Sequence, residues 1–398
     1  MKKLLLLGGS RYLLPVIREA KALGCHVITC DYLPDNIAHR YSDAYANVSI
    51  VEKDAVLALA KEKQVDGIMS FACDPGVVPA AYVAEKLGLP TVGPLESVEI
   101  LQDKGRFRAF LREHGFRVPG AISYSDPALA LRENRRYPVM VKPVDSAGSK
   151  GVSRVDRPGE LPAAIETALS FSRCGRFLLE DYIEPAGFPS DTDCFSVDGE
   201  LRFVSFNNQY FDRRADNPYT PAGFTWPSSM PEAAQAELAG ELQRLLRLLH
   251  MGTAVYNVEC RLGTDGLPYL MEVSPRGGGN RLCEMLQYTT GVNLIRNAVK
   301  AALGMPVEEM TGPDYKGHWS YVALHSEKSG PFAGLELAAE VRPYLVEEDL
   351  WVRPGERVEA FSGANKTLGT LVLNWPDEAS RDAHMAAPEK WLKILVEE

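Results

Sequence analysis

Short apolar runs alternate with amphipathic stretches over the first 95 residues. The run KLLLLG at 3–8 is apolar at nearly every position after the lysine, which is typical of a strand buried on both faces of a parallel sheet. The stretches between such runs repeat apolar residues at the spacing of one helix face. They lie near Leu14–Leu23, Asp54–Lys63 and Val77–Leu87. This alternation predicts the α/β fold class, with a parallel, doubly wound α/β domain at residues 1–95.

The period changes after Pro94, where a helix is expected over Leu95–His114. Further strands are expected within 137–144, 176–183, 194–197 and 200–207, followed by an amphipathic helix over Glu232–His250. Residues 208–228 follow neither period and are rich in aromatic and arginine side chains, so we expect a mobile functional loop there. Together these elements predict an α+β domain at residues 96–304.

The remaining residues, 305–398, are expected to form a small α+β cap over the cleft of the second domain. Strand patterns lie near 319–324, 358–360 and 366–373. A helix is expected after Pro376 and is predicted to end at Glu398. The segment carries no evident cluster of chemistry-bearing residues, so its predicted role is structural.

A hairpin at 255–274 brings two glutamates together. Asp265-Gly266 favours a two-residue type I′ turn, in which both residues need positive φ, and counting outward from it places Glu259 opposite Glu272. Carboxylates directly opposed on neighbouring strands repel each other, so a positive group is expected between them. Mg²⁺ fits, with Mn²⁺ as its alternative, because it takes one or two carboxylates and completes its shell with water and phosphates. The competing interpretation is a solvent-facing hairpin whose carboxylates are screened by water.

The hairpin leads directly into Arg276 and the triplet Gly277–Gly279. A helical pattern follows from Arg281. This order exposes backbone N–H groups at a helix start beside a guanidinium, which favours binding of an anion. The alternative for the three glycines is a flexible loop with no ligand.

A lysine and a small-residue loop form a second candidate site. Lys142 lies in the strand-like run YPVMVKPV, where its stem can pack while the ammonium contacts phosphate oxygens or points outward to water. The following loop, Asp145–Gly151, can fold its amides over phosphates, although it is not a G-x-x-x-x-G-K-[ST] sequence. Farther on, Glu180–Glu184 ends a strand with free backbone groups beside a glutamate, a combination that can pair with a purine edge.

The first strand ends in Gly8-Gly9-Ser10-Arg11, which resembles a dinucleotide loop but lacks the G-x-G-x-x-G spacing. A structural strand–helix turn is the favoured interpretation. The alternative is that its amides and Arg11 contact an anionic part of a substrate, with Asp31 hydrogen-bonding a hydroxyl or amine nearby.

Composition narrows the class of protein. The 398 residues suggest two or three domains, and 45% hydrophobic with 24% charged residues is ordinary for a soluble globular protein. A net charge of −10 disfavours a nucleic-acid partner. Seven dispersed cysteines without a C-x-x-C pair favour reduced thiols in the cytoplasm. No apolar stretch approaches the ~20 residues of a membrane helix, so no membrane partner is expected.

Taken together and in this order, the candidate residues resemble the ATP-grasp superfamily. The resemblance is carried by Lys104, Lys142, the Ser146–Gly151 loop, Glu180–Glu184, and the Glu259/Glu272 pair followed by Ser274-Pro275-Arg276. The run EVSPRGGG is similar to the E-V-[NS]-P-R ending of carbamoyl-phosphate-synthase-like ligases. The N-terminal unit looks like the domain that precedes ATP-grasp in the biotin carboxylase-like branch. Each motif alone is weak, but their set and order cover essentially the whole chain.

The resemblance implies ATP as the nucleotide and Mg²⁺ as its metal. Lys104 and Lys142 would bind ATP phosphates, and Arg276 would face the transferred phosphoryl group and the substrate. The loop covering the phosphates would use Ser146, Gly148, Ser149, Lys150 and Gly151. Glu180 and the backbone at Tyr182 and Ile183 would hold adenine, with Glu184 beside them. Glu259 and Glu272 would hold the metal.

Two positions depart from the family pattern. Ser274 stands where many relatives have a metal-binding Asn. The usual E-[YF]-S-V-D segment reads PSDTD at 189–193, so the ribose-binding Glu is missing and either Glu184 or Asp191 would replace it.

The implied chemistry is ATP-dependent activation of a small-molecule carboxylate as an acylphosphate, which an amine then attacks, giving ADP and phosphate. The alternatives are carboxyphosphate chemistry like that of biotin carboxylase, a nucleotide-binding dehydrogenase using the Gly8-Gly9 turn, and a nucleotide-binding protein without turnover. The acid, the amine and a homodimeric assembly stay open.

Overall fold

The computed structural model describes residues 1–397 and begins with a parallel sheet. The sheet has the order β3-β2-β1-β4. Its strands are β1 (Lys3–Leu7), β2 (His26–Cys30), β3 (Ala44–Ala46) and β4 (Gly67–Ser70), and its helices are α1 (Leu14–Ala22), α2 (Lys53–Lys63) and α3 (Val77–Leu87). Leu4 to Leu7 are fully buried, as expected for a parallel strand covered on both faces. The predicted α/β fold of this part is confirmed.

The helix expected at Leu95–His114 is two helices, α4 (Leu95–Gln102) and α5 (Lys104–Glu113). Asp103 separates them because its backbone is extended and its carboxylate accepts from the Arg106 N–H, which makes it the N-cap of α5. Lys104 is therefore the first residue of a helix, not an interior one.

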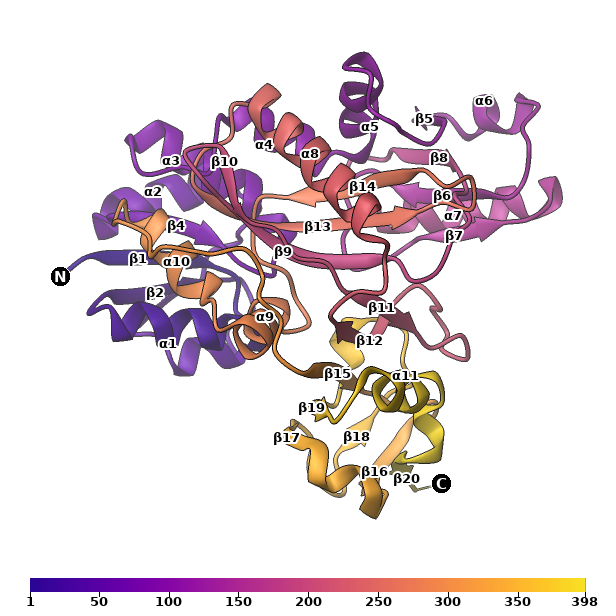
Figure 1. The fold of residues 1–398 in the computed structure, drawn as a ribbon. Helices are drawn as coiled ribbons and strands as arrows, with labels where there is room; N and C mark the ends of the chain where they lie inside the picture. Colours follow the sequence, from indigo (N-terminus) through magenta and orange to yellow (C-terminus); the bar gives the residue numbers. More distant parts are fainter. Residues whose placement is uncertain (398) are drawn as a thin grey trace.

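Two antiparallel sheets form the middle of the molecule, and α8 lies along one of them (Figure 1). The first has the order β5-β8-β6-β7 and the second β10-β9-β13-β14. Their strands are β5 (Ala121–Tyr124), β6 (Val139–Pro143), β7 (Ser153–Val155), β8 (Phe177–Asp181), β9 (Ser190–Val197), β10 (Glu200–Phe203), β13 (Ala254–Leu262) and β14 (Pro268–Ser274). The helices are α6 (Pro127–Arg132), α7 (Leu161–Phe171) and α8 (Glu232–Leu248).

The mobile loop expected at 208–228 is wrong. This stretch forms β11 (Asn208–Phe211) and β12 (Pro221–Trp226), and β12 pairs with β15 (His318–Leu324). The resulting sheet has the order β11-β12-β15-β19-β17, completed by β17 (Leu345–Leu350) and β19 (Gly369–Trp375). Phe224 and Trp226 are fully buried in it. The segment thus joins the middle of the chain to the C-terminal strands.

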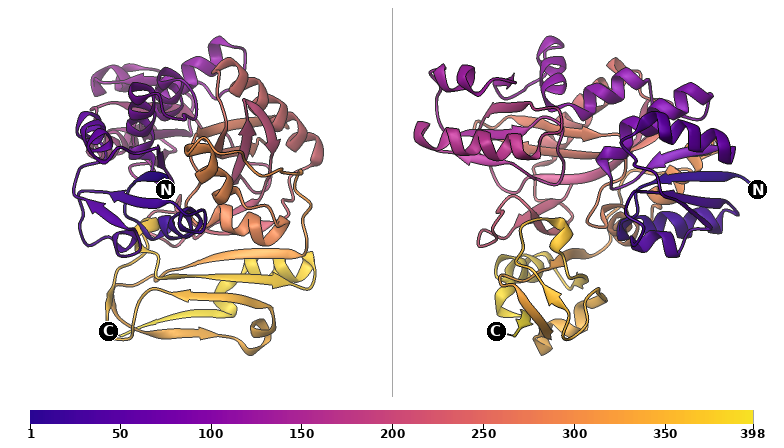
Figure 2. Two further views of the ribbon diagram at one scale, coloured as in Figure 1. Left: turned by 90° about the vertical axis from the view of Figure 1, so that its left-hand side faces the viewer. Right: turned by 180° about the vertical axis from the view of Figure 1, so that it is seen from behind.

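The C-terminal strands form a layered body below the rest of the molecule (Figure 2). A second sheet there contains β16 (Gly330–Leu337), β18 (Arg357–Val358) and β20 (Leu392–Val396). The helix predicted to run to Glu398 is wrong: α11 spans Glu378–Ala386 and the chain returns as β20. Pro388 lies two residues beyond the helix and cannot continue it. Glu398 lies outside the described residues.

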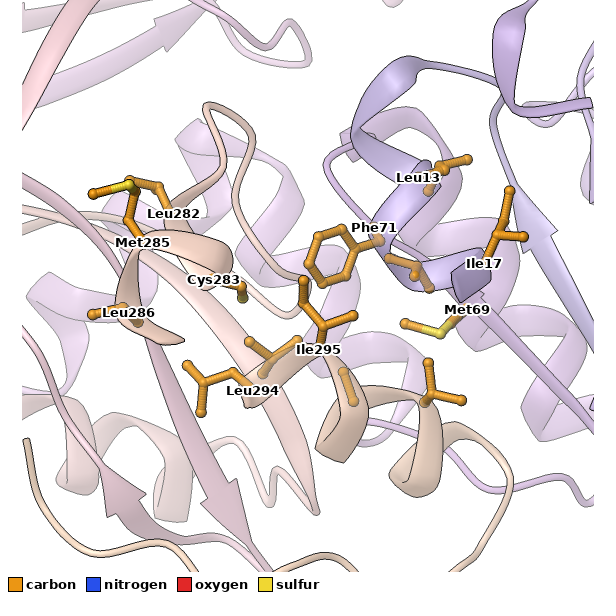
Figure 3. Close-up of a cluster of buried hydrophobic side chains, with 14 of the residues drawn as sticks. Leu13, Ile17, Met69, Phe71, Leu282, Cys283, Met285, Leu286, Leu294 and Ile295 are labelled. Carbon is orange, nitrogen blue, oxygen red and sulfur yellow. The ribbon is translucent and has the colours of Figure 1, made fainter. Parts of the chain in front are cut away.

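An apolar cluster fixes the N-terminal sheet against the segment that follows Arg276 (Figure 3). Side chains of the N-terminal unit meet those of α9 (Leu282–Thr290) and α10 (Leu294–Ala302). The labelled members are Leu13, Ile17, Met69, Phe71, Leu282, Cys283, Met285, Leu286, Leu294 and Ile295. Each such large side chain contributes roughly 1.5–3 kcal/mol when fully buried.

We keep residues 95 and 304 as proposed domain boundaries. No helix within residues 1–397 has the length and apolar character to cross a membrane.

Candidate active site

A cavity of about 2470 Å³ lies where the N-terminal sheet, both middle sheets and the C-terminal strands meet. Asp74, Lys142, Glu272 and His325 represent these four parts in its walls. Every residue that the ATP-grasp resemblance assigns to the nucleotide, the metal or the substrate lines this cavity, except Gly151. Gly151 is instead buried, and a Cβ atom there would lie 3.0 Å from the Phe171 side chain.

The register predicted for the hairpin is confirmed, but its turn is wrong. Glu259 pairs with Glu272. Asp265 does not have positive φ, however; only Gly266 does, at +78°, and the Gly266 N–H bonds to the Gly263 carbonyl. This is a three-residue loop of a type I turn followed by a left-handed glycine. It would shift the register by one residue, and a bulge at Met271, between the pairs Glu259–Glu272 and Cys260–Leu270, restores it.

Lys104 provides part of the positive charge expected beside the glutamates. Its Nζ lies 3.3 Å from Glu272 Oε2 and donates to the Ser146 carbonyl at 2.9 Å. Burial alone would lower the pKa of Lys104, but the carboxylates of Glu272, Asp74 and Glu259 raise it. The pKa of Glu259 is raised, first by burial and then by Glu272. Lys104 thus neutralises only part of the negative charge of Glu259 and Glu272.

The carboxylate pair fits a magnesium ion that shares its shell with a nucleotide. Among residues 1–397, no three or more His, Cys, Asp or Glu side chains gather as a metal cage. Mg²⁺ does not require one, since it keeps waters and phosphate oxygens beside one or two carboxylates. Because burial and Glu272 raise the pKa of Glu259, a cation beside the pair would stabilise the charged form of Glu259.

Asp191, on β9, forms a row of three carboxylates with Glu259 and Glu272. It faces Glu259 across β9 and β13, and its Oδ1 accepts from Asn257 Nδ2 at 2.7 Å. Burial, and then Glu259, raise the pKa of Asp191 well above its usual value. Of the two candidates for a ribose contact, Asp191 therefore lies in the carboxylate row, whereas Glu184 lies exposed beside the strand end at 181.

Lys142 is held by a buried glutamate. Its Nζ donates to Glu180 Oε1 at 2.7 Å, while Arg108 Nε donates to Glu180 Oε2 at 2.6 Å. Burial would raise the pKa of Glu180, but Arg108 and then Lys142 lower it to about 2. The pKa of Lys142 is lowered, chiefly by burial. Both Glu180 oxygens are thus bound within the protein, and Arg108, on one face of α5, had no distinguishing signal in the sequence.

The loop predicted to cover phosphates contacts the hairpin of β11 and β12. Ser149 Oγ donates to the Tyr219 carbonyl at 2.9 Å, and Asn217 Nδ2 donates to the Ser149 carbonyl at 3.1 Å. Gly148 and Ser149 both have positive φ, +65° and +57°. Gly148 adopts such an angle without strain because it has no Cβ atom. The residues 212–220 thus link this loop to the C-terminal sheet, and at their base Asp212 Oδ2 lies 3.2 Å from His325 Nε2.

The strand end predicted to hold adenine is braced from two sides. Arg261 Nη1 donates to the Ile183 carbonyl at 3.3 Å. The Glu184 carbonyl accepts from the Thr264 N–H at 2.9 Å. The Arg154 guanidinium lies 4.3 Å from the centre of the Tyr182 ring, a cation–π contact. This backbone is therefore held in place at the wall of the cavity.

Arg276 is paired with a residue that the sequence did not single out. Its Nε and Nη2 donate to the two oxygens of Asp74 at 2.9 and 2.8 Å. Burial would lower the pKa of Arg276, yet Asp74 raises it. Ser274 Oγ also donates to Asp74, at 2.9 Å, and accepts from Gln102 Nε2 at 2.8 Å. Ser274 is thus engaged within the protein.

The glycine triplet does not present all its amides to a ligand. The Gly278 N–H donates to both Asp193 oxygens, at 2.9 and 3.1 Å. Gly277 is required for packing, because a Cβ atom there would lie 2.2 Å from the Phe71 ring. Arg281, expected to begin the helix, is left-handed and precedes it. The Gly278 amide is therefore not open to an anion, whereas Gly279 and the Arg276 guanidinium line the cavity, so the anion site stays a prediction for these two.

The Gly8-Gly9 turn has the structural role that was favoured. A Cβ atom on Gly9 would lie 2.6 Å from Asn36, so the glycine allows close packing. Arg11 stacks on Trp351 at 5.1 Å, and Asp31 accepts from the Leu33 N–H and from Asn36 Nδ2. These contacts occupy the residues proposed for the alternative substrate role.

Two family models match the chain. The ATP-grasp domain model matches residues 135–284, and the ATP-grasp N-terminal domain model matches residues 17–91. The first match contains Lys142, Glu259, Glu272 and Arg276, and the second contains Asp74.

Curated relatives are similar over most of the chain. The carbamoyl phosphate synthase large chain of Ralstonia nicotianae is 25% identical over 77% of this chain, which spans only 30% of that protein. The formate-dependent phosphoribosylglycinamide formyltransferase of Parasynechococcus marenigrum is 22% identical, over 90% of this chain and 91% of that protein. Among solved structures, the L-amino acid ligase of Bacillus licheniformis has a TM-score of 0.81 and 21% identity, covering 100% of this chain and 99% of that one. This last likeness concerns the fold.

Proposed function

Because the chain belongs to the ATP-grasp superfamily, we propose that it is an ATP-dependent ligase that joins a small-molecule carboxylate to an amine. ATP-grasp enzymes use ATP and Mg²⁺. The observation that carries the proposal is the convergence of Lys104, the Glu259/Glu272 pair and Arg276 on one cavity. Phosphoryl transfer depends mostly on positioning and charge neutralisation, and this set provides both.

In this proposal, the nucleotide binds between the two middle sheets. Lys142 and Lys104 contact its phosphates, and the loop 146–150 covers them with backbone amides. The backbone at 182–183 pairs with the adenine edge, while Glu184 contacts the ribose. Glu180 holds the Lys142 ammonium through one oxygen and Arg108 through the other.

Glu259 and Glu272 would hold Mg²⁺, with Mn²⁺ as an alternative. The ion would neutralise the terminal phosphates during transfer. Lys104 would share Glu272 with it, since the ammonium is already 3.3 Å from Oε2. The metal-binding residues thus lie beside the lysine that contacts the same phosphates.

Arg276 would bind the substrate carboxylate and its phosphorylated form. A carboxylate oxygen attacks the γ-phosphorus, ADP leaves, and an acylphosphate forms. The amine nitrogen then attacks the carbonyl carbon, phosphate leaves with the bridging oxygen, and the nitrogen loses a proton. No nucleophilic side chain is required for either step.

An ADP-release screen tests this function. Wild-type protein is mixed with ATP and Mg²⁺ and with either pooled carboxylates, with and without pooled amines, or bicarbonate alone. Glu272→Gln serves as the inactive control. We expect ADP release that needs both pools, and a mass equal to acid plus amine minus water. Release stimulated by bicarbonate alone would instead support carboxyphosphate chemistry. The absence of release in every pool would contradict the ligase proposal.

A further inference from the structure

Asp74 lies at the point of the N-terminal sheet where α/β proteins commonly bind ligands. In the order β3-β2-β1-β4, chain progression reverses between β1 and β4, and the carboxyl ends of these two strands border a crevice. Asp74 follows β4 in a short helical turn, Asp74–Gly76, and lines the cavity. Gly76 fixes this turn against β4, because a Cβ atom there would lie 2.7 Å from Ser70 Oγ.

The contacts of Asp74 use one edge of the Arg276 guanidinium. Arg276 has five N–H bonds. Nε and Nη2 each donate one to Asp74, and Nη1 donates one to the Gly277 carbonyl at 3.1 Å. Within residues 1–397, one N–H bond therefore remains without a partner on each terminal nitrogen. Such a pair can donate to the two oxygens of a planar carboxylate.

Hydrogen bonds connect this pair to the end of α4, close in sequence to the lysine beside the metal-binding residues. Gln102 ends α4, donates to Ser274 and thereby contacts Asp74 through one intervening hydroxyl. Lys104 begins the next helix, two residues later. Asp74 is thus tied to β4, to β14 and to the end of α4, which fixes the direction of its carboxylate.

We infer that Asp74 is a positioning residue: it holds the Nε–Nη2 edge of Arg276 and thereby directs the N–H groups left on Nη1 and Nη2 toward the substrate carboxylate. The inference rests on the proposed function, because it gives Arg276 that substrate. The N-terminal domain then contributes to catalysis through Asp74, although it holds none of the ATP-grasp motifs. Asp74 itself does not contact the reacting atoms.

A double-mutant cycle on the full-length protein tests the inference. Asp74→Asn keeps the shape but weakens the hold on the guanidinium, and misplacement of a reacting group by about 1 Å can cost roughly 100-fold in rate. We expect kcat/KM for the acid identified in the ADP-release screen to fall 10- to 100-fold, with KM for ATP unchanged. In an Arg276→Lys background, the same Asp74 change should lower kcat/KM by less than about threefold, because lysine cannot make the two-point contact that Asp74 orients.

Glu347→Gln is the matched control, since Glu347 also pairs with an arginine, Arg281, at 2.8 and 2.9 Å but does not line the cavity. Its turnover should match that of the wild type. If Asp74→Asn does not fold, Asp74→Glu, which keeps the charge but shifts the carboxylate, should fold and show the same loss. Equal losses from Asp74→Asn in both backgrounds, or wild-type turnover in Asp74→Asn, would overturn the inference alone. A wild-type protein without any turnover would overturn the proposed function and the inference with it.

Discussion

Glu259 and Glu272 face each other across β13 and β14, and the Lys104 ammonium lies 3.3 Å from Glu272 Oε2. Two half-buried carboxylates on opposed strands repel each other, and one lysine offsets only part of that repulsion. The pKa of Glu259 is raised accordingly. A cation bound between the two glutamates would complete the neutralisation.

Glu272→Gln is expected to abolish Mg²⁺-dependent turnover without unfolding the protein. The change removes the repulsion from Glu259 but also the partner of Lys104. Without metal, the free energy of unfolding should therefore change by less than about 1 kcal/mol. Nucleotide and Mg²⁺ should raise the melting temperature of the wild type more than that of the variant. A large loss of stability without metal would mean that Glu272 is a structural partner.

Lys142→Ala should weaken ATP binding by about 1.5–3 kcal/mol, because a desolvated ammonium–phosphate contact is lost. This corresponds to roughly 10- to 150-fold in Kd, which calorimetry can measure. The fold should persist, since Arg108 still pairs with Glu180. Lys300→Ala is the control, because Lys300 pairs with Glu308 at 2.9 Å outside the cavity. Equal ATP affinity in the Lys142 and Lys300 variants would contradict the assignment.

Nucleotide should order the loop 146–150 and the residues in contact with it. Small residues give this loop conformational entropy that binding removes. Ser149 bonds to Asn217 and Tyr219, so the protection should extend to the hairpin of β11 and β12. Amide exchange with and without ATP measures both segments. Unchanged protection of 146–150 would argue against a lid, and protection confined to that loop would argue against the link.

Asp193 should make the nucleotide-free protein more stable at pH 5 than at pH 7. Burial raises its pKa to about 6, although Cys283 Sγ, the Arg276 charge, the Gly278 N–H and Asn257 Nδ2 all favour the charged form. In the unfolded chain this carboxyl group has its ordinary pKa of 3.8. The folded state therefore holds a proton that the unfolded chain has released between pH 3.8 and about 6, so stability falls as the pH rises through this range.

This carboxyl group contributes on the order of 1 kcal/mol between pH 7 and pH 5. Asp193→Asn should remove that part of the gain in denaturant-unfolding measurements at the two pH values. Other groups, including Asp191, contribute to the total, so the difference between wild type and variant is the relevant quantity. An identical pH dependence in both proteins would contradict the pKa shift.

Features within one continuous segment could be predicted from the sequence. The apolar runs gave the parallel sheet, and the hairpin gave the Glu259–Glu272 pair because its strands are neighbours in the chain. Even there, the pair was correct through two compensating irregularities, the longer turn and the bulge at Met271. The longer turn shifts the register by one residue and the bulge shifts it back, so Glu259 and Glu272 still face each other.

Features that depend on distant segments could not be predicted. β12 looked irregular because its partner, β15, comes much later in the chain. Arg108 and Asp74 lie on ordinary helical and turn positions, and their roles come from Glu180 and Arg276 in other elements. The one available signal for Asp74 was its place after a strand at the edge where doubly wound sheets bind ligands.

The fate of a carboxylate oxygen tests the central proposal, an acylphosphate intermediate, most directly. Lys104, Arg276 and the Mg²⁺ that Glu259 and Glu272 would hold place positive charge where terminal phosphates would meet a carboxylate, which favours attack at the γ-phosphorus. The acid identified in the ADP-release screen is prepared with ¹⁸O in its carboxylate, and the phosphate products are analysed by mass spectrometry. We predict that one ¹⁸O atom per turnover appears in inorganic phosphate, with ADP as the nucleotide product. Label in AMP, or pyrophosphate as the product, would contradict the proposal.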